Sequence, residues 1–409
     1  MEEIKFALDT FYAVMAGALV MWMAAGFTML EAGMIKKKNA AEIVTKNIGL
    51  YSIACIMYLI CGFALMYPAG ALLDGVIPSL GTSLGLSTSM DNADIGMPYG
   101  MDYSQQADFF FQVVFVATAM SIVSGAVAGR MKILPFFLFA IVLTGFIYPI
   151  QGYWNWGGGF LSGTVGYSDY AGSGTVHLCG AAAALAVVHV LGPRKGKYNS
   201  DGSSNVIAGS NIPMAALGVW ILWLGWFGFN GGSELVVSNE SAAIAVSQVF
   251  LNTNIAAAGG VVASLMISQL VKGKMDITMA MNGAIAGLVA ITAAPSAPSA
   301  GAALLIGAVG GIIVYFSITG LDKRGIDDPV GAISAHGVVG IWGVLAVWFT
   351  GGSLLAQAAG VLAIAGFTYL ASLVTILVID RFIPIRASDT EQDTGLDLVE
   401  TGVEAYPEF

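Results

Sequence analysis

Hydrophobic segments of about 20 residues recur along the whole chain and are separated by short polar breaks. An α-helix needs about 20 apolar residues to cross the hydrocarbon core of a bilayer, so each segment is long enough for one crossing. We count eleven segments, at roughly 10–35, 47–72, 107–129, 133–152, 171–192, 212–232, 243–270, 277–295, 299–320, 329–350 and 355–383. The pattern predicts an all-α polytopic membrane protein with eleven transmembrane helices.

Composition agrees with this prediction and excludes a soluble fold. Hydrophobic residues make up 57% of the 409 residues and charged residues only 10%, whereas soluble domains carry about 25% charged residues. The 53 glycines are typical of helices that pack closely within a membrane. The three cysteines lie inside hydrophobic segments at a spacing that suits neither disulfides nor a metal site.

Basic residues follow the odd-numbered segments. Of the sixteen Lys and Arg residues, all except Lys5 lie in or beside the breaks after those segments. Because basic loops accumulate on the cytoplasmic side, we expect the N-terminus outside and the C-terminus inside the cell (inner) membrane. Residues 1–386 are then the membrane domain, and the acidic, polar residues 387–409 form a cytoplasmic regulatory tail. The net charge of −10 reflects the outer loops and this tail, so no nucleic-acid partner is indicated.

Two histidines share a spacing that stands out in so apolar a chain. His177 follows Asp169 by eight residues, and His336 follows Asp328 by eight residues. The fifth segment runs inward and the tenth runs outward, so eight residues carry each histidine about 12 Å into the core from opposite faces. Ionisable side chains inside a membrane are costly and usually functional. We therefore predict that the two imidazoles lie near the midplane.

Opposite directions with matched spacing are typical of an inverted repeat. We expect one repeat over about 10–192 and a second over about 212–350, with the helix at 355–383 added. Transporters with such repeats place their substrate site at the midplane between the halves. Each histidine could instead be a core residue bonded to a carbonyl, and a haem held by both is a further alternative. The matched pair favours a functional role over both.

Aromatic residues gather at the predicted outer face. Phe111 and Phe115 share one helix face, because they are four residues apart. Trp156 follows the fourth segment, and Phe229 and Ser233 end the sixth. Aromatic faces attract cations by roughly 0.5–2 kcal/mol each, and a hydroxyl can accept a hydrogen bond. The cluster suits a small ammonium-like ion, although an aromatic belt facing lipid headgroups remains the alternative.

Together these motifs resemble the ammonium transporter family, the Amt branch of the Amt/Mep/Rh superfamily. The resemblance covers essentially the whole chain. Its motifs are Asp169-Tyr-Ala-Gly-Ser-Gly-Thr-Val-His177, Trp226-Phe-Gly-Phe-Asn-Gly-Gly-Ser233, Asp327-Asp-Pro-Val-Gly-Ala-Ile-Ser-Ala-His336-Gly and Gly395-Leu-Asp. As a set they are highly specific.

The resemblance implies a homotrimer with one pore per subunit, no cofactor and no metal. It assigns each predicted site residue a role: ammonium recruitment to Phe111, Trp156 and Ser233, a phenyl gate to Phe115 and Phe229, a twin-histidine pair to His177 and His336, and a supporting acid to Asp169. From its position we expect Asp169 to cap the fifth helix without touching substrate. The family's usual partner is a PII-type signal protein, for which the basic inner loops are a plausible dock.

We expect ammonium to lose its proton near the gate and ammonia to pass the histidines, because a bare ion in an apolar pore is costly. The pair could also relay the proton, so both an electrogenic transporter and a passive ammonia channel stay open. An ammonium sensor signalling through its tail is the main alternative, and an Rh-like channel is another, although Trp156 and Ser233 favour the Amt branch. No enzyme is indicated.

Three details fall outside the transport site. Glu31 is the remaining carboxylate within a hydrophobic segment, and we interpret it as a structural hydrogen-bond partner. The tail reads Glu400-Thr401-Gly402-Val403-Glu404-Ala405-Tyr406 where the family often has His-Gly-Glu before a tyrosine. Gly331 replaces an aspartate found in some members. The changed sequence of the tail leaves open how the tail regulates the protein.

Overall fold

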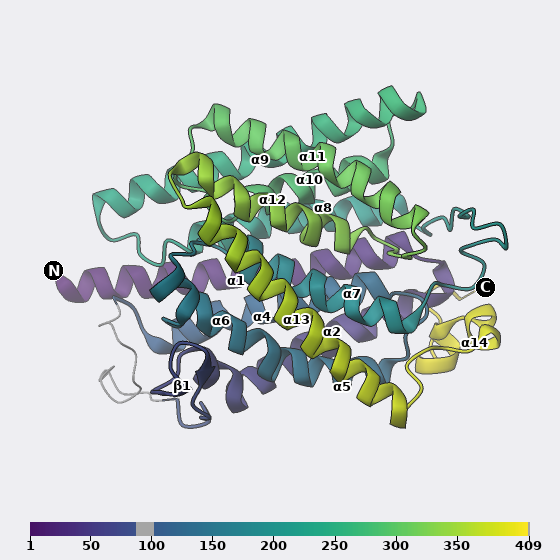
Figure 1. The fold of residues 1–409 in the computed structure, drawn as a ribbon, viewed down its shortest axis with the longest axis horizontal. Helices are drawn as coiled ribbons and strands as arrows, with labels where there is room; N and C mark the ends of the chain where they lie inside the picture. Colours follow the sequence, from purple (N-terminus) through teal and green to yellow (C-terminus); the bar gives the residue numbers. More distant parts are fainter. Residues whose placement is uncertain (87–101, 408–409) are drawn as a thin grey trace.

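The protein folds into a bundle of long helices, with its termini at opposite ends of the long axis (Figure 1). This computed structural model describes residues 1–86 and 102–407. Within these residues, ten helical spans are long and apolar enough to cross a membrane, and α10 (Ile277–Ile291) is a shorter apolar helix. The prediction of an all-helical, multi-span membrane protein is therefore confirmed.

The first half contains five spans. They are α1 (Glu2–Met34); a second span made of η1 (Lys37–Asn39), α2 (Ala40–Met57), η2 (Tyr58–Gly62) and α3 (Phe63–Met66); α4 (Gln105–Val127); a fourth span made of α5 (Ile133–Val142), η4 (Leu143–Ile147) and α6 (Tyr148–Asn155); and a fifth made of η6 (Ser173–Leu178) and α7 (Cys179–Leu191). A hairpin of β1 (Ala71–Leu73) and β2 (Ile77–Pro78) follows the second span, and η5 (Leu161–Val165) follows the fourth.

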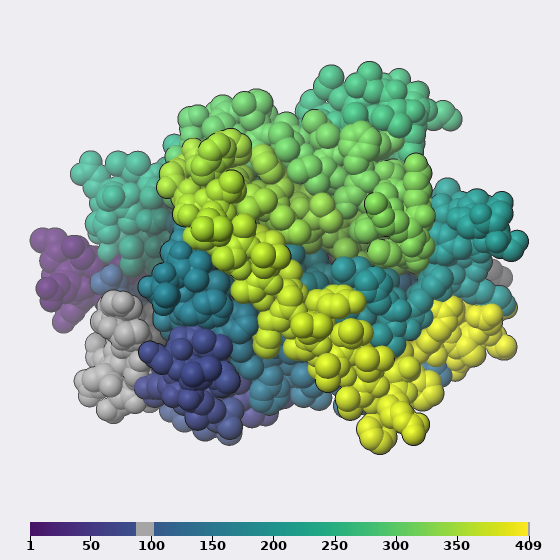
Figure 2. Space-filling model, viewed as in Figure 1, coloured from purple at the N-terminus to yellow at the C-terminus, as the bar shows by residue number. Residues whose placement is uncertain are grey.

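The second half of the chain is helical as well. Its elements are α8 (Ile212–Gly232), α9 (Glu240–Lys272), α10, α11 (Ala300–Lys323), and a broken span made of η7 (Ile333–Val338), α12 (Val339–Ala346) and η8 (Val347–Thr350). Then α13 (Leu354–Phe382) crosses the outside of the bundle as a diagonal ridge (Figure 2). The tail carries α14 (Asp389–Thr394) and η9 (Asp397–Thr401).

Two of the differences between the observed spans and the sequence prediction have a physical reason. The second span begins at Lys37 instead of about residue 47, because Glu42 and Lys46, one turn apart and both buried, form an ion pair. Each of the two residues neutralises the charge of the other, whereas a hydropathy pattern counts each charge as a break between segments. The helix α10 has only 15 residues, about 22 Å. It is buried from Met279 to Ile291, so protein surrounds it and its length need not match the bilayer.

Small residues bring the helices close together. In α9, Gly260 lies against α10, where an added Cβ would stand 3.0 Å from the backbone nitrogen of Gly287. Between α1 and α8, a Cβ on Gly26 would lie 2.9 Å from the carbonyl oxygen of Gly218. Close backbone approach of this kind is a main source of helix association in membranes, where water cannot drive apolar faces together.

The tail packs against the basic loops at one end of the bundle. Lys132 Nζ lies 2.9 Å from Glu391 Oε1, Lys195 Nζ lies 2.5 Å from Asp393 Oδ2, and Lys38 contacts the Asp393 carbonyl. These contacts bring the loops after the first, third and fifth spans to the same end. The hydrogen bond from Lys132 lowers the pKa of the Glu391 carboxyl. Three of the basic segments that the charge pattern assigns to one side therefore lie at one end of the bundle.

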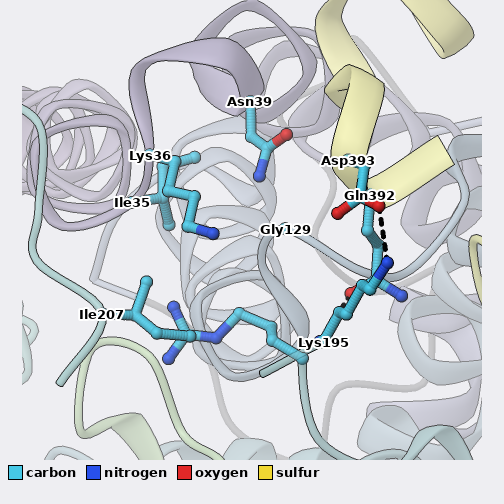
Figure 3. Close-up of a pocket in the computed structure, with 9 residues that line it drawn as sticks. Ile35, Lys36, Asn39, Gly129, Lys195, Ile207, Gln392 and Asp393 are labelled. Atoms are coloured by element: carbon cyan, nitrogen blue, oxygen red, sulfur yellow. Dashed lines mark hydrogen bonds and ion pairs between the residues drawn. The ribbon is translucent and has the colours of Figure 1, made fainter. Parts of the chain in front are cut away.

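A small pocket lies between the tail and these loops (Figure 3), bordered by Lys36, Asn39, Lys195, Gln392 and Asp393 among others. Next to it, an ion pair joins the loop after the fifth span to the start of the tenth: Arg194 Nη2 lies 2.8 Å from Asp327 Oδ1. Burial alone would raise the pKa of Asp327, but the hydrogen bonds from Arg194 and nearby guanidinium charge lower it to about 2.

Enlarging Gly260 tests the close packing of α9 on α10. We expect Gly260→Leu to destabilise the folded protein by about 1–3 kcal/mol or more, because backbone atoms cannot move aside as a flexible side chain can. The measurement is the temperature at which monodisperse protein is lost in detergent, read by size-exclusion chromatography after heating. Gly366→Leu is the matched control, since nothing lies within 4 Å of a Cβ at that glycine in α13. Equal midpoints for the two variants would contradict the packing argument.

Candidate functional site

The two predicted histidines lie side by side in the centre of the bundle. His177 and His336 are 0% and 2% exposed, and their Nδ1 atoms are 3.1 Å apart. The rings are 5.1 Å apart between centroids and inclined by 27°. Each residue sits in the widened first turn of a broken helix, His177 in η6 and His336 in η7. The matched spacing in the sequence thus corresponds to a pair in direct contact.

Asp169 holds the start of η6. Its carboxylate accepts hydrogen bonds from the backbone N–H groups of Gly172 (3.2 Å), Gly174 (2.9 Å) and Thr175 (2.8 Å) and from the Tyr167 hydroxyl (3.1 Å). Burial raises the pKa of Asp169, while the hydrogen bonds that it accepts act in the opposite direction. The side chain therefore satisfies the free donors of a helix N-terminus, which is the cap expected from the sequence.

Asp328 does the same for η7. It accepts hydrogen bonds from the backbone N–H groups of Gly331 (3.1 Å), Ala332 (3.0 Å) and Ile333 (2.7 Å). Both aspartates thus bind three N–H groups three to six residues further on, and both precede a histidine by eight residues. The fifth and tenth spans thus begin in the same way, and the inverted repeat stays a prediction.

Aromatic rings continue the histidine pair on one side. The ring of Phe229 stacks on His177 at 5.3 Å and on Phe115 at 4.0 Å, each at 27°. Trp226 stacks on His177 at 4.9 Å and donates through Nε1 to the Thr292 hydroxyl at 2.9 Å. Phe115 and Phe229 are 1% and 0% exposed. The two phenyl rings close the approach to the histidines.

The remaining predicted residues border this closure. Phe111 meets Phe115 edge-on at 4.8 Å, and Trp156 does so at 6.1 Å. Trp156 Nε1 donates to the backbone carbonyl of Asp169 at 2.9 Å, which fixes the indole. The Ser233 hydroxyl donates to the Phe229 carbonyl at 2.8 Å, so the lone pairs of its oxygen can accept. All the predicted site residues thus belong to one continuous cluster.

Two further rings, for which the sequence predicted no role, contact the imidazoles. Trp226 is the first residue of the Trp226–Ser233 motif. Its spacing of three residues from Phe229 could have indicated a shared helix face. Phe27 of α1 lies 6.2 Å from His336, and no motif marked it. Both rings shield the imidazoles from water.

The haem alternative does not fit this geometry. A haem held by both imidazoles would lie between them, but the two rings stack on each other at 5.1 Å between centroids and their Nδ1 atoms are 3.1 Å apart. Among residues 1–86 and 102–407, no three His, Cys, Asp or Glu side chains group in a way that could hold a metal ion. The pair is a hydrogen-bonding unit.

Comparison with known proteins gives consistent matches over the full length. A family model described as Ammonium Transporter Family matches residues 11–406. The ammonium transporter Amt2 of Archaeoglobus fulgidus is 39% identical, covering 100% of this chain and 90% of the relative. The ammonium transporter of Bacillus subtilis is 30% identical, covering 97% of this chain and 98% of the relative.

Solved structures agree. A protein described as "Sensor Amt Protein" has a TM-score of 0.88 at 33% identity, covering 98% of this chain and 100% of that one. Mep2 of Candida albicans has a TM-score of 0.82 at 25% identity, covering 96% of this chain and 89% of that one. With a family model that spans nearly every residue and relatives of matching length, the chain belongs to the ammonium transporter family.

Proposed function

We propose that this multi-pass protein of the cell membrane recruits ammonium at its outer face and conducts ammonia past the histidine pair. The observation that carries the proposal is the 3.1 Å contact between His177 and His336 at the end of a closed aromatic stack. Membership of a transporter family supports transport of ammonium and means that the protein is not an enzyme.

Recruitment takes place at Phe111, Trp156 and Ser233. Ammonium has four N–H donors and no acceptor, so ring faces and a hydroxyl oxygen suit it. The hydrogen bond from Ser233 to the Phe229 carbonyl leaves the oxygen free to accept. A small cation in water is stabilised largely by its hydration shell. The ring faces and the hydroxyl replace part of that shell before the ion reaches the gate.

The gate consists of Phe115 and Phe229, which must separate for anything to pass. Beyond them the path is enclosed by rings, where an unpaired charge costs many kcal/mol. Ammonia carries no charge and is the cheaper species to move. Potassium has a similar size but cannot lose a proton, so the same section rejects it.

The histidine pair offers one donor and one acceptor to the passing molecule. For the two Nδ1 atoms to share a hydrogen bond, one imidazole must carry its proton on Nδ1 and the other on Nε2. The first then presents a bare Nε2 and the second an Nε2–H group, and ammonia can bond to both. A proton arriving at the bare nitrogen could cross the shared bond and leave from the other ring, which is the electrogenic version of the mechanism.

Asp169 acts through the backbone. Because its carboxylate is used by the N–H groups that begin η6, it fixes the turn that carries His177 and keeps Trp156 in place through its own carbonyl. Its negative charge also favours a cation at the outer face. We assign it as a positioning residue.

A sensor function is the second candidate, favoured by the close structural match to the protein described as "Sensor Amt Protein". The contacts between the tail and three inner loops would give such a signal a route, since a change in the helices would move α14. Transport and sensing share the same outer site. The homotrimer and a PII-type partner remain part of this proposal, and such a partner would meet basic loops that the tail already contacts.

Replacing His177 tests the relay. We expect His177→Ala to abolish ammonium-triggered current in proteoliposomes, because no path then carries the proton across the pair. The measurement is the transient current after a jump in ammonium concentration. His189→Ala is the matched control, since His189 lies near the inner end of α7 and bonds to the Tyr369 hydroxyl, outside the pore. Ammonia flux in the wild-type protein without any current would rule out the electrogenic version.

Replacing Trp156 tests recruitment. We expect Trp156→Leu to raise the half-saturating ammonium concentration roughly 3- to 30-fold, the range that one cation–π contact provides. The maximal signal should change less, since the gate and histidines are retained. Trp348→Leu serves as control, because Trp348 is a half-exposed tryptophan in η8, outside the aromatic cluster. If both variants saturate like the wild-type protein, ammonium is recruited elsewhere.

A further inference from the structure

Glu31 is a buried carboxylate that the mechanism above does not use. It lies in the last turns of α1 and is 1% exposed. Its Oε2 atom accepts hydrogen bonds from the Ser124 hydroxyl at 2.7 Å and the Asn47 amide at 3.1 Å. Its Oε1 atom has no hydrogen-bond partner among the described residues. Half of the carboxylate is thus anchored and the other half is free to bind.

A cavity connects this carboxylate with one histidine of the pair, His336. It has a volume of about 10 Å³, close to what one water-sized molecule needs. Its walls include Glu31, His336, Phe27, Ser121 and Asn282. Since α1 ends just before the basic residues of the inner loop, the cavity lies between the histidines and the predicted cytoplasmic face.

Asn282 presents a second free acceptor to the same cavity. Its side chain is 6% exposed, and its Nδ2 donates to the Thr278 carbonyl at 3.1 Å. That bond fixes which end of the amide is the oxygen, and Oδ1 has no hydrogen-bond partner in the part of the chain that the structure describes. Gly331 leaves room for it, because a Cβ there would come within 2.6 Å of Oδ1. The Ser121 hydroxyl donates to Ala117 and can also accept.

The cavity wall therefore carries a carboxyl group and further acceptors, and the structure gives Glu31 no ion-pair partner within the described residues. The buried Lys46 pairs with Glu42 and donates to the Met131 carbonyl at 2.6 Å. A buried carboxylate with a free oxygen is unfavourable unless a cation or a donor reaches it. A small cation with several N–H donors suits a cavity lined by two such acceptors.

We propose that Glu31 and Asn282 form an inner binding site for ammonium, on the cytoplasmic side of the histidine pair. The site holds the ion as it leaves the pore or when it enters from the cytoplasm. This inference rests on the proposed transport of ammonium and adds a second, distinct site to the outer one. It also gives Glu31 a role beyond that of a structural hydrogen-bond partner.

Affinity measured separately from the two faces tests the proposal. Right-side-out and inverted membrane vesicles expose the outer and inner faces, and a pH-sensitive dye reports ammonium-driven flux. We expect Glu31→Gln to raise the half-saturating concentration about tenfold for ammonium at the inner face, because a hydrogen-bonded charge is replaced by a neutral amide of the same shape. Saturation from the outer face should stay at the wild-type value. Glu240→Gln, an exposed glutamate at the start of α9, is the matched control.

Two further variants keep the test decisive if Glu31→Gln folds poorly. Asn282→Leu removes the second acceptor and should raise the half-saturating concentration at the inner face only, and Glu31→Asp should recover part of the loss. Equal changes from both faces, or none, would overturn the inner site and leave the proposed function intact. No flux in wild-type vesicles would instead refute the proposed function.

Discussion

The functional centre depends on carboxylate caps at two broken helices. A helix that begins inside a protein leaves backbone N–H groups without partners, and in an apolar interior each unpaired group costs several kcal/mol. Asp169 and Asp328 each accept hydrogen bonds from three of these N–H groups. The caps allow the fifth and tenth spans to begin below the surface and fix the first turns, which carry His177 and His336. Without these caps, the two helix turns would not be held where their imidazoles contact each other.

Much of this arrangement could be predicted from the sequence because it depends on periodicity and spacing. Hydropathy located the spans, the basic residues identified a common face, and equal Asp-to-His spacing placed the pair. The structure adds the features that depend on how the helices cross in three dimensions. The stacking of Trp226 and Phe27 on the imidazoles requires the crossing of α8 and α1 over the pair, which no local pattern encodes.

Other features could not be predicted from the sequence, because they depend on how residues contact each other in the folded protein. The early start of the second span depends on a buried pair, Glu42 and Lys46, whose charges look like a helix end when they are counted singly. The sequence predicted a segment at 277–295, but α10 already ends at Ile291, and only its burial explains why so short a helix suffices. Glu31 was correctly expected to accept hydrogen bonds, but the free oxygen and its cavity appear only in three dimensions.

The packing between the two halves limits how the protein can move. The helices α1 and α8 meet at backbone distance through Gly26 and Gly218, and α13 lies across both halves, touching α5 and α7 on one side and α12 on the other. Rocking one half against the other, the motion of many carriers with inverted repeats, would break these contacts together. Rotation of a few side chains such as Phe115 and Phe229 would not. Domain motions take microseconds to milliseconds, so opening by rotation of the two rings alone would leave the frame of packed helices unchanged.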